Sequence, residues 1–340
     1  MQNLVKAHNQ LFSRRPDERF SSLSELWEHC HREKQESQTR WYSPMDVCIE
    51  PTNGSLRMVA NDEPFGLNDW VFGQVCKLAE VSKETVSRLS SKTASLVLGE
   101  TLPRGNKPLQ VFTLGDQIRS VHGVSYTRLY NVDLLSLVLE FVTDFEAAQE
   151  AMGGGTGLYC GEQDMFCFLI DPTGWTEIDG QFFAPGFFLW NSEVGRRTVG
   201  VQTFWFQKVC QNHIVWDAVD IVEFTRKHTT NVHEALDSIR EILVTLTKRR
   251  DERQDGFVRV ITKAMKEVLG HDEDEVIPIL QAQGINRAIA KEALSIAKGQ
   301  GEFTIYSVVD ALTRLSQRNV FAGERAQIDY RASRLLTLVA

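Results

Sequence analysis

The apolar positions of the chain change period several times, and each change predicts a new element. Residues 23–30 carry apolar side chains at helical spacing, behind serines that can cap a helix. Two β-type runs, 45–50 and 55–60, flank Asn53-Gly54, a dipeptide typical of a tight turn between antiparallel strands. We therefore expect an amphipathic helix followed by a β-hairpin.

The middle of the chain repeats this alternation of helix and hairpin. Helical spacing returns over residues 67–98, and two short strand patterns then surround Gly115-Asp116. Asn131 or Asp133 can cap a further helix, which we expect to run to about residue 151.

Residues 158–216 are rich in aromatic and β-branched side chains and read as three long β-type runs joined by turns. In the last run Val199, Val201 and Trp205 fall on one face of the strand, and Phe204 and Phe206 fall on the other. Both faces are apolar, which predicts a central strand covered on both sides. The short turns between the runs favour an antiparallel meander.

Beyond residue 221 the pattern becomes almost entirely helical. Apolar residues between 232 and 246 follow a three-four spacing that suits either self-association or packing on a sheet. We predict an α+β fold, with a mostly antiparallel sheet covered by helices in residues 1–220 and a helical C-terminal region in residues 221–340.

Composition narrows the class of protein without naming it. The 340 residues are 42% hydrophobic and carry a formal net charge of -8, which opposes wholesale attraction to nucleic acid but allows a local basic groove. The start of the chain has no secretory signal pattern, and no apolar run is long enough to cross a bilayer. Six cysteines without CxxC pairs are typical of a reducing compartment. We expect a cytoplasmic protein without a membrane partner.

Catalytic and cofactor motifs are not evident. The glycines of residues 153–157 follow a helix pattern and precede a strand pattern, the reverse of what a phosphate loop needs. Cys210 and His213 have zinc-ligand spacing, but a structural zinc site needs four ligands. A GxSxG nucleophile elbow is missing from the sequence. We assign no catalytic residue, no metal ligand and no cofactor.

Basic and aromatic residues suggest a surface for a single strand, where cations follow the phosphates and rings stack on the bases. Arg196 and Arg197 lie at a predicted hairpin tip. The alternative is that the rings belong to the core and the cations to turn tips. The full predicted set for nucleic-acid binding is Arg196, Arg197, Lys208, Arg119, Arg128, Tyr126 and Trp190.

Two segments carry a family resemblance. NSEVG at residues 191–195 and CQNHIVW at residues 210–216, supported by weaker patterns in residues 118–135 and 302–317, resemble the phage- and plasmid-associated family of domain of unknown function 932. The resemblance implies a mobile-element protein. A β-meander with a covering helix is, at the level of the fold, similar to single-strand annealing proteins of the Rad-fifty-two type. The chain departs from such proteins in its acidity and its long helical third.

These observations leave three functional hypotheses. The first is a non-enzymatic protein that binds single-stranded DNA as a homo-oligomer, in strand annealing or recombination, with NSEVGRR as an exposed working edge. The second is a metal-dependent nucleic-acid enzyme that uses Asp164, Asp171 and Glu193. The third is a protein-interaction or anti-defence factor whose acidic surface contacts another protein.

Overall fold

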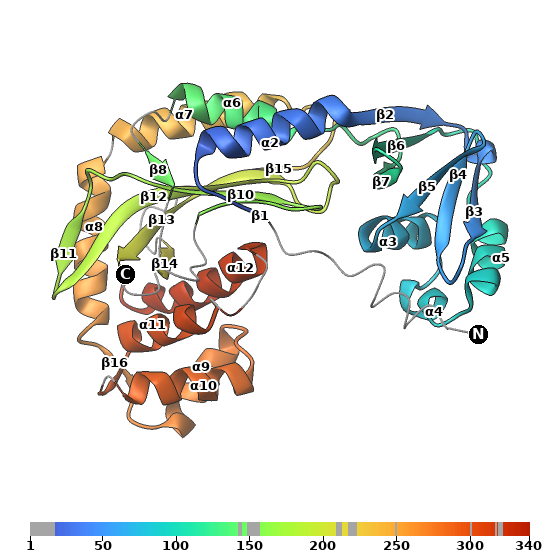
Figure 1. Ribbon diagram of the computed structural model, residues 1–340. Coiled ribbons are helices and arrows are strands. Elements are labelled where there is room, and N and C mark those ends of the chain that lie inside the picture. The colour runs from blue at the N-terminus through green and yellow to red at the C-terminus, as the bar shows by residue number, and fades with distance from the viewer. Residues whose placement is uncertain are drawn as a thin grey trace.

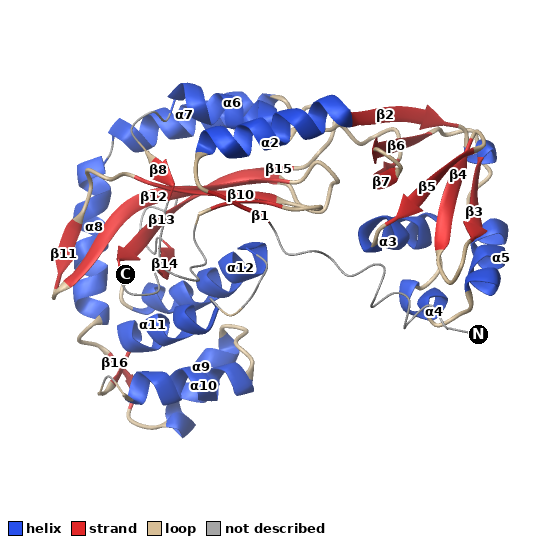
Figure 2. Cartoon of the chain, in the orientation of Figure 1, coloured by secondary structure: helices blue, strands red, loops and turns tan. Residues whose placement is uncertain are grey.

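The chain folds as the sequence predicts, into an α+β structure with helices at its C-terminal end (Figures 1 and 2). The structure is a computed structural model. The residues it describes are 18–141, 145–147, 157–208, 213–216, 223–248, 250–299, 301–316, 318 and 322–340. Residues 153–156 of the glycine-rich segment and Cys210 lie outside these ranges. The expectations that the segment is not a phosphate loop and that Cys210 is not a zinc ligand therefore stay predictions.

A six-stranded sheet with its own core forms the N-terminal unit, drawn in blue and cyan in Figure 1. Its strand order is β2-β6-β7-β5-β4-β3, and the pairing of β5 with β7 is parallel. The predicted hairpin around Asn53-Gly54 is confirmed as β3 and β4. The elements of this unit are β2 (Ser37–Tyr42), β3 (Val47–Pro51), β4 (Leu56–Ala60), β5 (Glu63–Leu67), α3 (Asp69–Leu78), α4 (Lys83–Ser87), α5 (Ser91–Thr101), β6 (Leu109–Leu114) and β7 (Gln117–His122).

A second, antiparallel sheet of nine described strands forms the centre of the molecule. Its main path is β1-β9-β10-β12-β13-β14, and β8, β11 and β15 pair at its margins. The meander predicted for residues 158–216 is confirmed. The strands are β1 (Glu18–Phe20), β8 (Glu146–Ala147), β9 (Leu158–Cys160), β10 (Met165–Ile170), β11 (Thr176–Ile178), β12 (Gln181–Asn191), β13 (Val199–Lys208), β14 (His213–Trp216) and β15 (Glu223–Arg226).

Different cores cover the two faces of this central sheet. Helices α2 (Leu23–Glu36), α6 (Asn131–Phe141) and α7 (Glu234–Lys248) cover one face, as Figure 1 shows, and Val199 and Val201 of β13 are buried beneath them. Phe204 and Phe206 are buried on the opposite, aromatic face. The prediction that β13 is a central strand covered on both sides is therefore confirmed.

The remaining helices enclose a further core, which also includes Ile178 of β11 and Phe183 of β12. Trp205 of β13 belongs to this core and stacks on Phe257 with ring centroids 4.1 Å apart. The elements are α8 (Arg250–Ala264), β16 (Val268–Gly270), α9 (Glu273–Ala282), α10 (Arg287–Lys298), β17 (Phe303–Thr304), α11 (Ile305–Ser316) and α12 (Ala322–Ser333), with short 3-10 helices at Pro44–Asp46 and Arg334–Leu338.

The buried clusters do not divide at residue 220, where the sequence predicts a boundary. Helix α7 packs on the central sheet, and Trp205 packs among the C-terminal helices. Residues 37–122, which the sequence does not separate, have a core of their own. None of the described helices has the length and apolarity needed to span a membrane.

Trp205 tests whether the sheet and the C-terminal helices form one cooperative unit. Replacing this fully buried ring, Trp205→Ala, should lower the free energy of unfolding by about 3–5 kcal/mol, because it leaves a cavity between β13 and α8. Denaturant unfolding followed by circular dichroism measures the change. The half-exposed Trp41→Ala is the control, expected within about 0.5 kcal/mol of wild type. Equal effects of the two substitutions would contradict this packing.

Candidate functional site

The NSEVG turn between β12 and β13 is buried, not exposed. Asn191, Ser192, Glu193 and Val194 are all at most 2% accessible. The expectation of an exposed working edge at NSEVGRR is wrong for this first part of the segment. The physical reason is that other elements of the chain supply partners for most of its polar groups.

The Glu193 carboxylate lies at the centre of these contacts. It accepts a hydrogen bond from the Asn131 backbone N–H at 2.8 Å, at the start of α6, and faces Arg119 Nη1 of β7 at 3.5 Å. Arg119 also pairs with Glu33 of α2 at 3.2 Å. Burial raises the pKa of Glu193, and Arg119 opposes that rise. One carboxylate thus joins the turn to β7 and to two helices.

Backbone carbonyls of the turn accept hydrogen bonds from the N-terminal unit and its connection. Trp70 Nε1 and His122 Nε2 donate to the Val194 carbonyl at 3.0 Å and 3.1 Å. Tyr126 Oη donates to the Glu193 carbonyl at 2.8 Å, and the Tyr126 ring stacks on His122 with centroids 3.6 Å apart. These contacts anchor the six-stranded unit to the central sheet.

Several residues predicted to bind nucleic acid belong to this network instead. Arg119 and Arg128 are 6% and 7% accessible, and the half-buried Tyr126 is held by the contacts described above. The Arg128 guanidinium lies over the Phe112 ring, 3.6 Å from its centroid, and donates to the Glu193 carbonyl. A buried, paired cation cannot follow phosphates at a surface, so we correct the assignment of Arg119 and Arg128, while that of Tyr126 stays a prediction.

Arg196 and Arg197 lie close to the surface but pair with a buried carboxylate. Arg196 Nη1 and Arg197 Nε are 3.5 Å and 3.3 Å from Asp164 Oδ2, whose side chain is fully buried. The two arginine side chains keep 25% and 20% exposure. Lys208 ends β13, opposite Phe182, and its side chain lies outside the described part of the chain.

The carboxylates of the predicted metal-dependent enzyme are engaged separately. Asp164 pairs with the two arginines, Glu193 with Arg119, and Asp171 accepts hydrogen bonds from the backbone and hydroxyl of Thr173. Within the described residues these three carboxylates do not form a group close enough to share a metal ion.

A pocket of about 360 Å³ opens beside the turn, between the aromatic face of the sheet and α12. Trp190, just before the turn, and Arg197, at its end, both line it. Phe166, Phe188 and Trp190 form a series of rings, with neighbouring centroids 5.7 Å and 4.9 Å apart. The lining residues are Phe166, Phe188, Trp190, Arg197, Thr198, Gln202, Glu223, Gly323, Ala326, Gln327 and Tyr330.

Two features distinguish this pocket. Gln202 Nε2 is buried and has no hydrogen-bond partner among the described residues, which is uncommon for a buried amide. Gly323 brings α12 so close that an added Cβ would lie 2.4 Å from Phe166 and 2.8 Å from Arg197. A donor in a ring-lined cavity suits a flat molecule with polar edges.

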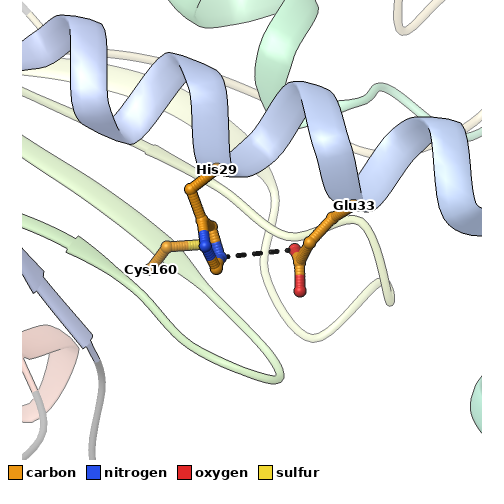
Figure 3. Close-up of side chains that lie close together, drawn as sticks. All are labelled: His29, Glu33 and Cys160. Carbon is orange, nitrogen blue, oxygen red and sulfur yellow. Dashed lines mark ion pairs between the residues drawn. The ribbon is translucent and has the colours of Figure 1, made fainter.

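A separate cluster lies on the other side of the central sheet. Figure 3 shows His29 and Glu33 on one face of α2, with Cys160 of β9 beside the His29 ring. His29 Nε2 is 3.8 Å from Glu33 Oε2, and the ligand atoms of the three residues all lie within 4.8 Å of one another. The hydrogen bond to Cys160 raises the pKa of His29.

Comparison of the chain with family models, curated proteins and solved structures finds no match. The resemblance of NSEVG and CQNHIVW to the family of domain of unknown function 932 therefore stays a prediction.

The sequence pattern alone does not point to Gln202, Gly323 or the His29 cluster. Gln202 lies in a strand whose apolar pattern explains its neighbours, and only its burial without a partner singles it out. The spacing of His29 and Glu33, four residues apart on a predicted helix, is a usable signal. Cys160 carries no such signal, because it reaches the cluster through the tertiary fold.

Glu193→Gln tests the role of the buried carboxylate. The substitution keeps the shape of the side chain but leaves Arg119 with Glu33 as its charged partner, so we expect a loss of about 2–4 kcal/mol in the free energy of unfolding. Chemical denaturation gives the value. Glu63→Gln removes an exposed pair with Arg40 and should cost less than about 1 kcal/mol. A Glu193→Gln protein as stable as wild type would refute the role.

The histidines beside the turn predict acid sensitivity. Burial lowers the pKa of His122 to about 3 and that of His228 to about 4, from an ordinary value of 6.5. Below pH 6.5 the unfolded chain therefore binds more protons than the folded chain. The stability gained by keeping both histidines neutral is fully present above pH 6.5 and is lost as the pH falls toward 4. Each histidine contributes a slope of about 1.4 kcal/mol per pH unit in that window.

His122→Gln should reduce the slope of the unfolding free energy against pH by about 1.4 kcal/mol per pH unit, the contribution of one proton. Identical slopes in wild type and His122→Gln, measured by denaturation between pH 4 and 7, would show that His122 is not buried as a neutral ring.

Proposed function

We propose that the chain binds single-stranded DNA and holds an unpaired base in the Trp190 pocket. The observation that carries this proposal is the buried Gln202 Nε2, which has no hydrogen-bond partner among the described residues, in a side chain that lines a ring-lined cavity. A nucleobase offers a π-face to Trp190 and a polar edge to Gln202, Gln327 or Glu223. The volume of about 360 Å³ lies at the lower end of the range for small-molecule pockets.

The charges around the pocket suit one phosphate rather than a long run of them. Arg197 lines the cavity, and Gly323 is the second residue of α12, so the positive end of that helix lies at the same place. Asp164 partly neutralises Arg197, and the chain as a whole is acidic. Stacking and base-edge contacts therefore supply most of the affinity, and salt weakens it only modestly.

The setting of this activity follows from the sequence resemblance. We propose a non-enzymatic mobile-element protein that acts in the cytoplasm as a homo-oligomer, in strand annealing or recombination. The metal-dependent nucleic-acid enzyme is less well supported, because Asp164, Asp171 and Glu193 have separate partners. A protein partner for the acidic surface is the remaining alternative, and the binding experiment distinguishes it.

Trp190→Ala tests the proposal. Loss of one base-stacking ring should weaken binding of a labelled single-stranded oligonucleotide roughly 5- to 150-fold, corresponding to about 1–3 kcal/mol. Fluorescence anisotropy at several salt concentrations measures the affinity. In wild type, the slope of log affinity against log salt should lie between about -0.7 and -1.4, as expected for one or two phosphate contacts.

Trp175→Ala is the matched control, because Trp175 packs on the same aromatic face but does not line the pocket. It should bind like wild type. Equal losses in the two variants, or a steep salt slope that Trp190→Ala leaves unchanged, would contradict base capture. Failure of the wild-type chain to bind at low salt would favour a protein partner instead.

A further inference from the structure

We propose that His29, Glu33 and Cys160 bind a zinc ion that links helix α2 to strand β9. Figure 3 shows the His29 ring between Cys160 and Glu33, and Cys160 belongs to the core beneath α2, α6 and α7. This site is distinct from the Trp190 pocket and does not depend on the proposed function.

The spacing of the ligand atoms suits a tetrahedral ion. His29 and Glu33 are one helical turn apart, so both side chains reach the same side of α2. Zinc bonds of about 2.0–2.3 Å place neighbouring ligand atoms roughly 3.3–3.8 Å apart. His29 Nε2 and Glu33 Oε2 are 3.8 Å apart, and all three ligand atoms lie within 4.8 Å. Small side-chain rotations therefore bring them into contact with one ion.

The surroundings resemble the second layer of a metal site. Arg119 Nη1 donates to Glu33 at 3.2 Å, which orients the carboxylate. Asn131 Nδ2 donates to Cys160 Sγ at 3.9 Å, a contact that stabilises a thiolate. Cys30 Sγ lies 4.0 Å from Cys160 Sγ, within reach of a fourth position. The Glu33 carboxylate and a Cys160 thiolate would together balance the charge of a divalent zinc ion.

A cysteine, a histidine and a carboxylate in contact could also form a triad for nucleophilic catalysis. The burial of the cysteine excludes that activity. Cys160 is 2% accessible, and a substrate carbonyl cannot reach its sulfur.

The donor set selects the class of metal. A thiolate and an imidazole favour zinc over magnesium or calcium, which take oxygen ligands. Zinc at this place would tie the α2 segment that carries Glu33 to the sheet, next to the Arg119 and Glu193 pair. The expected consequence is a more stable chain, because a ligand that binds only the folded state stabilises it.

Zinc content and cobalt spectra of the full-length chain test the proposal. We expect a single zinc per chain by mass spectrometry of metals after dialysis, and an intense thiolate-to-cobalt absorption band when Co²⁺ replaces it. His29→Gln and Cys160→Ser should each lower zinc affinity about tenfold or more, measured against a competing chelator. Each should also abolish the thermal stabilisation that added zinc gives to wild type.

Matched controls separate loss of a ligand from loss of fold. The first control is His31→Gln, because His31 lies on the same helix and stacks on Trp27. The second is Cys76→Ser, which removes a buried thiol from the N-terminal unit. Both should retain zinc and the cobalt band. The proposal is overturned if wild type binds neither metal, if the controls lose the metal equally, or if peptide mapping finds a Cys30–Cys160 disulfide in place of free thiols.

Discussion

The buried carboxylate of Glu193 is the interaction on which the arrangement of the chain depends. A carboxylate removed from water costs several kcal/mol unless charges and hydrogen bonds replace its hydration. Here Arg119 and the start of α6 provide that replacement, and Arg119 in turn holds Glu33 of α2. The requirement to satisfy one charge therefore fixes the relative positions of a turn, a strand and two helices.

The fixed turn has a consequence for the pocket. Trp190 precedes the turn and Arg197 ends it, so the turn fixes the positions of both residues. The Trp190 ring is further confined because it lies over Gly200, where an added Cβ would come within 2.3 Å of it. Buried hydrogen bonds and ion pairs on one side of the turn thus hold a ring and a guanidinium at the cavity on the other. Such rigidity lowers the ordering cost of binding a flat ligand.

Local patterns predicted much of the fold, while long-range polar contacts lay beyond them. The β3–β4 hairpin, the α2 helix and the two faces of β13 follow from spacing and turn chemistry alone. The helix expected to continue beyond Phe141 was wrong at Glu146–Ala147, which pairs with β10, because tertiary pairing overrides weak helical spacing. NSEVGRR reads as a solvated turn, since its charges give no sign of the partners that bury them, and Arg119 is 74 residues away from Glu193.

Photo-cross-linking of a single-stranded oligonucleotide that carries 5-iododeoxyuridine is the most direct test that the turn positions a base-binding pocket. The halogenated base reacts with an aromatic ring in contact with it, and peptide mapping then locates that ring. We predict a cross-link at Trp190, with Tyr330 at the rim as the next most reactive ring. Cross-links confined to exposed rings of the six-stranded unit, such as Trp41, would contradict the assignment of the pocket.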